Sequence, residues 1–229
     1  MIKRLLHLSE RFWIKVVDCF LNINTVPPAR ERCWLGDSSA PYTPLDISSA
    51  RLYADSSPYA SPNYLHLWRI CRLLKAGPED VLYDIGCGMG RVICVMARGM
   101  TRKCVGIELS PSLCEIARDN AIQLRRRKAT IQIVCGDAAT ANLSGGTIYF
   151  MFNPFGIETM KQVLARIEAS RSDCDRAIAI IYYNAVHADL LNSCGWLTRI
   201  EGFNTFTGRS VIIWGNRLWQ ERTSSRRSA

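Results

Sequence analysis

Four polar residues of this chain stand at the ends of short apolar runs, where their side chains could bind a ligand. They are Asp84, Glu108, Asp137 and Asn153. Parallel strands present their carboxyl ends at one edge of a sheet, so we expect these side chains to lie close together there. A carboxylate such as Glu108 at that edge can accept hydrogen bonds from both hydroxyls of a ribose. Each residue alone could equally be a turn residue of an ordinary α/β protein, because such turns favour Gly, Asp and Asn.

A glycine loop follows the first of these runs. Gly86, Gly88 and Gly90 stand at alternate positions after the apolar stretch 81–85. Glycines let the backbone turn sharply and approach a ligand closely, with amide groups and the N-terminus of the next helix facing it. A dinucleotide-binding loop would carry its third glycine where this chain has Arg91. The spacing therefore indicates a nucleoside cofactor other than a dinucleotide.

This loop resembles motif I of the class I S-adenosylmethionine-dependent methyltransferases, in which Gly-x-Gly-x-Gly follows an acidic residue at the place of Asp84. The resemblance covers residues 64–216, where the strand ends occur in the order found in the family. It implies S-adenosyl-L-methionine as the cofactor. It also implies an α/β fold with a doubly wound Rossmann-like sheet of strand order 3-2-1-4-5-7-6, the last strand being antiparallel.

The resemblance further implies which residues bind the cofactor. By its place in the family's motifs, Asp137 would accept a hydrogen bond from the adenine amine. Cys87 lies inside the loop and could also be no more than a small filler. The implied cofactor-binding residues are Asp84, Gly86, Cys87, Gly88, Gly90, Glu108, Leu109, Asp137, Ala138 and Asn153.

The turn Asn153-Pro154-Phe155-Gly156 corresponds to motif IV of the family, beside the transferable methyl group. In amino-methylating relatives, a motif Asn/Asp/Ser-Pro-Pro-Tyr/Phe accepts hydrogen bonds from an amine through its polar side chain and a backbone carbonyl. This chain lacks the second proline, so the substrates of those relatives are not implied. We expect Asn153 and the Pro154 carbonyl to orient an amine and Phe155 to wall the pocket.

These features predict an enzyme that methylates nitrogen, such as a protein lysine or another amine. Two other functions stay open from the residues alone. One is a small-molecule or lipid-linked methyltransferase acting on oxygen or nitrogen, and the other is a cofactor-binding scaffold subunit without turnover. No motif indicates the acceptor, the number of methyl groups added or the oligomeric state.

Apolar periodicity predicts the elements that position these residues. Strands alternate with helices and end in a hairpin, which is typical of a doubly wound α/β sheet. The expected helices are 64–76, 91–100, 111–127 and 159–170, and the expected strands are 81–85, 104–108, 131–137, 147–153, 177–183, 196–203 and 210–214.

Three parts are predicted along the chain: residues 1–62, the methyltransferase domain 63–216 and a basic, flexible tail 217–229. Residues 1–24 read as an amphipathic helix that packs on this chain or a second subunit, or makes peripheral contact with a membrane. The rest of the first part is a cover segment rich in proline and serine. It contains two candidate substrate contacts, Tyr53 and Tyr59.

Composition narrows the classes of protein. The chain has 229 residues, enough for one enzyme-sized domain, and a net charge of +9 that suggests an anionic partner. Nucleic acid stays open but unsupported, because no RNA-binding motif accompanies the charge. The ten cysteines are scattered without a Cys-x-x-Cys pair, which favours free thiols in a reducing compartment, hence the cytoplasm. Only three histidines occur, far apart, so no metal site is expected.

Overall fold

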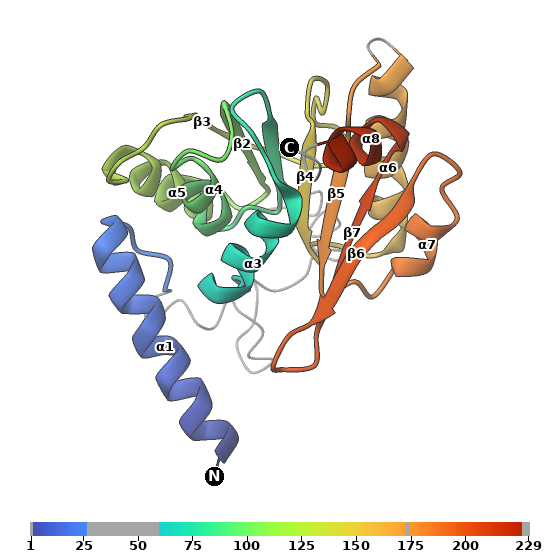
Figure 1. The fold of residues 1–229 in the computed structure, drawn as a ribbon. Coiled ribbons are helices and arrows are strands. Elements are labelled where there is room, and N and C mark those ends of the chain that lie inside the picture. The colour runs from blue at the N-terminus through green and yellow to red at the C-terminus, as the bar shows by residue number, and fades with distance from the viewer. Residues whose placement is uncertain (1, 27–59, 173–174, 226–229) are drawn as a thin grey trace, which may run out of the picture.

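The computed structural model describes residues 2–26, 60–172 and 175–225, and its centre is a seven-stranded sheet (Figure 1). The strand order is β3-β2-β1-β4-β5-β7-β6, as the resemblance implied. The strands are β1 (Val81–Ile85), β2 (Lys103–Glu108), β3 (Thr130–Cys135), β4 (Ile148–Phe152), β5 (Ala179–Tyr183), β6 (Thr198–Asn204) and β7 (Ser210–Gly215).

The pairing of the strands brings Asp84, Glu108 and Asn153 to one edge of the sheet. Strands β1 to β5 pair in parallel, and β7 runs antiparallel to both β5 and β6. The carboxyl ends of β1, β2, β4 and β5 therefore share an edge with the turn of the β6–β7 hairpin. We call this edge the carboxyl edge of the sheet.

Helices cover both faces of the sheet. Apolar side chains of α3, α4 and α8 join one buried cluster, and those of α6 and α7 join another cluster on the opposite face. Successive residues of a strand point to opposite faces, which is how β4 contributes Phe150 to the first cluster and Met151 to the second. The helices are α1 (Ile2–Leu21), α3 (Tyr64–Leu74), α4 (Arg91–Met96), α5 (Pro111–Gln123), α6 (Ile157–Ser172), α7 (Ala188–Asn192) and α8 (Arg217–Ser225).

Helix α4, which follows the glycine loop, is shorter than expected. It ends at Met96, although the apolar pattern predicted a helix as far as Met100. The Ala97 carbonyl accepts the amides of Lys128 and Ala129, at 2.8 and 2.9 Å, where the chain enters β3. A pairing with a distant segment thus replaces the next helical turn.

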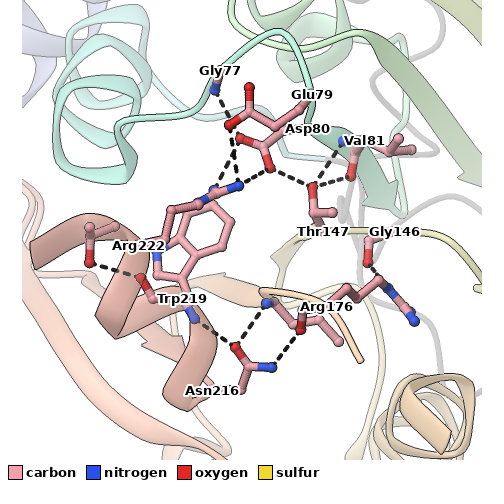
Figure 2. Close-up of polar contacts among 12 residues, drawn as sticks. Gly77, Glu79, Asp80, Val81, Gly146, Thr147, Arg176, Asn216, Trp219 and Arg222 are labelled. Atoms are coloured by element: carbon pink, nitrogen blue, oxygen red, sulfur yellow. Dashed lines mark hydrogen bonds and ion pairs between the residues drawn. The ribbon is translucent and has the colours of Figure 1, made fainter. Parts of the chain in front are cut away.

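The prediction of a flexible tail from residue 217 was wrong for residues 217–225, which form α8. Trp219 is only 1% exposed and belongs to the core. Arg222 pairs with the buried Asp80 through two nitrogens, at 2.8 and 3.1 Å (Figure 2). Asn216 begins the helix by accepting the amides of Trp219 and Ile178, both at 3.0 Å. These contacts hold α8 at the edge opposite the carboxyl edge.

Helix α1 contacts the rest of the chain mainly near its C-terminal end. Leu21 and Ile23 are buried in the first cluster, whereas Phe12, Trp13 and Phe20 are 63%, 64% and 59% exposed. The remainder of the helix runs away from the sheet (Figure 1). Contact of this apolar face with a membrane or a second subunit stays a prediction. Among the helices in the described residues, none is long and apolar enough to cross a bilayer.

Candidate active site

The glycine loop has the backbone shape that its sequence predicted. Gly86, Gly88 and Gly90 have φ values of 78°, 53° and 82°, which residues other than glycine rarely adopt. The amides of Gly86 and Cys87 donate to the Ile107 carbonyl of β2, at 2.9 and 3.0 Å. The loop is therefore fixed to the neighbouring strand before α4 begins.

The turn after β4 packs directly against this loop. A Cβ atom placed on Gly86 would lie 2.7 Å from the Pro154 Cβ, which is too close for any side chain. Gly86 is thus required both by its backbone angle and by the approach of Pro154. The structure places the predicted cofactor loop and the predicted acceptor turn side by side.

Glu108 connects the end of β2 to the loop. Its carboxylate accepts the Gly88 amide at 2.8 Å and the Ser110 amide at 2.9 Å. Burial raises the pKa of Glu108, and the bonds from backbone amides act in the opposite direction. Each carboxylate oxygen can still accept a further hydrogen bond. Glu108 and the adjacent Leu109 are half-buried, so a ligand can reach them.

Asp84 is the least satisfied carboxylate of the site. Its side chain is 2% exposed, and among the described residues its Oδ2 atom has no hydrogen-bond partner. Burial raises the pKa of Asp84 well above the usual range, and the neighbouring Glu108 raises it further. Two carboxylates held close together out of water favour a ligand with positive charge and hydrogen-bond donors.

Cys87, inside the glycine loop, has a structural contact. Cys87 is buried, with its sulfur where a Cβ on Gly106 would lie 2.7 Å away, and burial raises the pKa of its thiol. It therefore fills space as an uncharged thiol.

Two further predicted residues follow β3. Asp137 accepts the Ala139 amide at 2.8 Å, and both Asp137 and Ala138 are half-buried. Contact of Asp137 and Ala138 with a ligand stays a prediction.

Asn153 is held in a defined orientation at the end of β4. Its backbone has φ of 39°, in the left-handed region that Asn tolerates better than most residues. Its Oδ1 atom accepts the Tyr182 hydroxyl at 2.9 Å, and burial raises the pKa of Tyr182 to about 12, so this hydroxyl keeps its proton. Phe155 is 8% exposed and belongs to the buried cluster that also contains side chains of α6 and α7. Its role as a pocket wall stays a prediction.

One residue of the loop region has a role that the sequence did not reveal. Arg91 is 3% exposed and donates to the Thr25 hydroxyl, the Thr25 carbonyl and the Pro62 carbonyl, at 2.8, 3.1 and 3.0 Å. It joins the segment after α1 and the segment before α3 to the start of α4. In the sequence, Arg91 indicated only that the loop does not bind a dinucleotide, because it occupies the place of that loop's third glycine.

Two predicted residues fall elsewhere. Tyr53 and Tyr59, the candidate substrate contacts, lie outside the described residues. Within residues 2–26, 60–172 and 175–225, no group of His, Cys, Asp and Glu side chains is arranged to hold a metal ion.

Comparison with known proteins identifies the part of the chain that carries the site. Residues 82–171 match a family model described as a methyltransferase domain. A protein-lysine N-methyltransferase of Saccharolobus islandicus is 29% identical over 101 residues, which are 44% of this chain and 62% of that protein. A histone-lysine N-methyltransferase of Caenorhabditis elegans, specific for H3 lysine-79, is 35% identical over 79 residues, or 34% of this chain and 8% of that protein. The matches span less than two thirds of either relative.

Solved structures show the same fold at low identity. An RNA methyltransferase of Salinibacter ruber, in complex with S-adenosylhomocysteine, superposes with a TM-score of 0.53 at 23% identity, over 69% of this chain and 94% of that chain. A precorrin 8w decarboxylase of Methanobacterium thermoautotrophicum superposes with a TM-score of 0.52 at 18% identity, over 69% and 92% of the two chains. The reactions of these two proteins differ, so the likeness concerns the fold and not the acceptor.

Proposed function

Since this chain carries a class I S-adenosylmethionine-dependent methyltransferase domain, we propose that it transfers a methyl group to an amine nitrogen, with a protein lysine as the favoured acceptor. One observation carries the proposal. The Asn153-Pro154 turn packs against the glycine loop at Gly86, so an amine bound at this turn would lie beside the cofactor site.

The residues at the carboxyl edge fit S-adenosylmethionine. This cofactor has two positively charged groups and two ribose hydroxyls, and the edge offers two carboxylates that form no ion pair with another described residue. Asp84 Oδ2 has no hydrogen-bond partner among the described residues, and Glu108 retains free acceptor capacity. When bound, the cofactor supplies a methyl group already activated by its sulfonium. No further electrophilic catalyst is needed in the proposal.

The chain itself has to orient the acceptor. We infer that Asn153 Oδ1 and the Pro154 carbonyl accept hydrogen bonds from the two N–H groups of an amine, which directs its lone pair away from them. The Tyr182 hydroxyl holds Oδ1 in place at 2.9 Å and leaves one of its lone pairs for the acceptor. The amine must enter as the free base, because an ammonium group has no lone pair for attack.

Lysine is favoured over other amines by the two curated relatives, which are both lysine N-methyltransferases by name. The matches cover only part of either relative, so the shared acceptor is part of the proposal. A small-molecule or lipid-linked acceptor and a scaffold role stay as the alternatives.

Transfer of a labelled methyl group tests this function. The purified chain is incubated with methyl-labelled S-adenosylmethionine and lysine-containing peptides, and mass spectrometry locates the methyl group. Asn153→Ala should lower kcat by about a hundredfold while the cofactor Kd changes little, because the side chain acts on the acceptor. The matched control is Asn184→Ala, since Asn184 also has a left-handed backbone, with φ of 56°, one strand away.

The two variants separate catalysis from backbone strain. A similar loss of kcat in both variants would indicate strain and would remove Asn153 from the mechanism. Methyl label found on oxygen or only on RNA would overturn the amine proposal. Cofactor binding without transfer to any acceptor, in the presence of cell extract, would favour the scaffold role.

A further inference from the structure

A patch of aromatic and basic side chains lies at the carboxyl edge, on the side of the sheet away from β1 and β2. Its members come from α3, from the end of β4, and from the β6–β7 hairpin, which extends past the sheet on the side opposite α8 (Figure 1). The hairpin patch, as we call it, consists of Arg69, Phe152, Phe203, Phe206 and Arg209.

Two buried side chains join the patch into one unit. The His66 ring lies 6.1 Å from the Phe203 ring and 5.8 Å from the Phe206 ring. His66 Nδ1 is hydrogen-bonded to the Tyr183 hydroxyl at 2.8 Å, and the Tyr183 ring lies 4.3 Å from that of Phe152. His66 and Tyr183 are 8% and 2% exposed, so the base of the patch is buried.

Phe206 projects into solvent from a hydrogen-bonded turn. Its side chain is 93% exposed. The turn beneath it is closed by Thr205, whose amide donates to the Arg209 carbonyl at 2.8 Å and whose hydroxyl accepts the Arg209 amide at 2.9 Å. An aromatic ring that is exposed on a fixed turn loses little entropy on binding, which is typical of an interface anchor.

The guanidinium of each arginine in the patch lies over one aromatic ring. The Arg69 guanidinium lies 4.1 Å from the centre of the Phe203 ring, and the Arg209 guanidinium lies 5.4 Å from that of Phe152. Both side chains are exposed. A guanidinium that stacks on a ring still presents its N–H groups outward, in a geometry that matches a carboxylate.

The patch adjoins the proposed acceptor position. Phe152 directly precedes Asn153, and it pairs with Tyr183 across β4 and β5. We propose that the hairpin patch docks an acidic segment of the protein acceptor, with Phe206 contacting an apolar side chain and the two arginines pairing with carboxylates next to the target lysine. This inference rests on the proposed function.

Charge decides which acceptor segment suits this surface. A lysine side chain would be repelled by the two arginines, so a target lysine requires negative neighbours that compensate for the repulsion. A nucleic acid strand would instead need a basic track along its backbone with successive stacking platforms. The patch offers two arginines around one fully exposed ring, which favours a short acidic peptide segment.

Matched peptides test the docking site. Each peptide carries one central lysine and one leucine, and the flanking residues are acidic in the first, neutral in the second and basic in the third. With the wild-type chain we expect KM for the acidic peptide to be about tenfold lower than for the neutral one. Phe206→Ala should raise that KM about tenfold with little change in kcat. The double variant Arg69→Glu, Arg209→Glu should prefer the basic peptide.

The control is Arg217→Glu, because Arg217 is 85% exposed on α8 at the far edge of the sheet. It changes the net charge in the same direction and should leave the peptide preference as it is. Equal KM values for the three peptides with wild-type protein would overturn the docking site but leave lysine methylation intact. Tighter binding of an RNA oligonucleotide, lost in Phe206→Ala, would also overturn it. Binding of the acidic peptide without methylation of any lysine would refute the proposed function alone.

Discussion

The Arg91 guanidinium, at the start of the helix after the glycine loop, donates to the Thr25 hydroxyl at 2.8 Å from a position 66 residues further along the chain. The same hydroxyl donates to the Asp18 carboxylate of α1 at 2.8 Å. Thr25 therefore bridges a buried cation and a buried anion, which are 3% and 4% exposed. Tyr64 at the start of α3 also donates to Asp18, and burial raises the pKa of this tyrosine.

The bridge fixes the N-terminal segment behind the loop, and Asn120 of α5 strengthens the connection. Its Nδ2 atom donates to the carbonyls of Asn24 and Met89, at 2.8 and 2.9 Å, and Met89 belongs to the glycine loop. The loop is thus supported on one side by β2 and on the other by residues near the N-terminus. We infer that this support keeps the loop in the shape that binds the cofactor.

Thr25→Val tests the bridge. The change keeps the shape of the side chain but removes the hydroxyl between Arg91 and Asp18. The free energy of unfolding should fall by about 1–3 kcal/mol, because the buried Arg91 Nε loses its acceptor and the Asp18 carboxylate loses one of its donors. Chemical denaturation with urea measures this change. Thr198→Val, at an exposed position of β6, is the control and should change stability by less than about 0.5 kcal/mol.

Asp84→Asn should have opposite effects on stability and on binding. The substitution removes a carboxyl group whose ionisation is opposed by burial, so the ligand-free chain should gain about 1–2 kcal/mol in its free energy of unfolding at neutral pH. The Kd for S-adenosylhomocysteine should rise at least tenfold, since a carboxylate that faces a cationic ligand is lost. Differential scanning calorimetry and titration calorimetry measure the two effects. A gain in stability with unchanged Kd would remove Asp84 from the cofactor site.

The raised pKa of Asp84 makes the stability of the ligand-free chain depend on pH. The pKa of Asp84 is raised in the folded chain, so the folded state binds more protons than the unfolded state between the usual carboxyl pKa and the raised one. Stability of the ligand-free chain should therefore fall as the pH rises through this window, and cofactor affinity should rise. In Asp84→Asn both slopes should become shallower. Equal slopes in the two proteins would show that Asp84 does not cause this pH dependence.

The geometry around the glycine loop was predictable where its signals are local. The glycine spacing and the polar residues at strand ends indicated the loop, Glu108 and Asn153 because such turns require particular residue types. Arg91 was not predictable as a clamp, since its partners Thr25 and Pro62 lie 66 and 29 residues away. Its contacts depend on how the N-terminal segment folds back on the core, which no local pattern encodes.

The difference between local signals and contacts with distant residues also explains why α8 was not predicted. Serines and arginines after residue 216 indicated a frayed tail, because a polar composition with little apolar periodicity is typical of disordered ends. The single buried Trp219 and the pairing of Arg222 with Asp80, 142 residues apart, outweigh that composition. The order of strands, by contrast, came from the resemblance to a family rather than from periodicity.

Gly86→Ala tests the contact between loop and acceptor turn. A methyl group at this position would meet Pro154 at 2.7 Å and would also strain a backbone with φ of 78°. We expect a loss of about 2–4 kcal/mol in stability and at least a tenfold higher Kd for S-adenosylhomocysteine. Gly195→Ala is the control, because a Cβ on Gly195 meets nothing within 4 Å. Normal cofactor binding in Gly86→Ala would show that the loop is not in the site.

Arg222→Met tests whether α8 is part of the folded domain. The change leaves the buried Asp80 carboxylate, which is fully shielded from solvent, with the Gly77 amide and the Thr147 hydroxyl but without a cation. Loss of one partner of a buried ion pair costs about 3–5 kcal/mol, so the midpoint of urea denaturation should fall markedly. Arg217→Met removes an exposed pair with Glu221 on the same helix and should cost about 0.5 kcal/mol or less. Equal, small effects of both substitutions would mean that α8 detaches without unfolding the sheet, and cleavage after residue 216 by limited proteolysis would then show it directly.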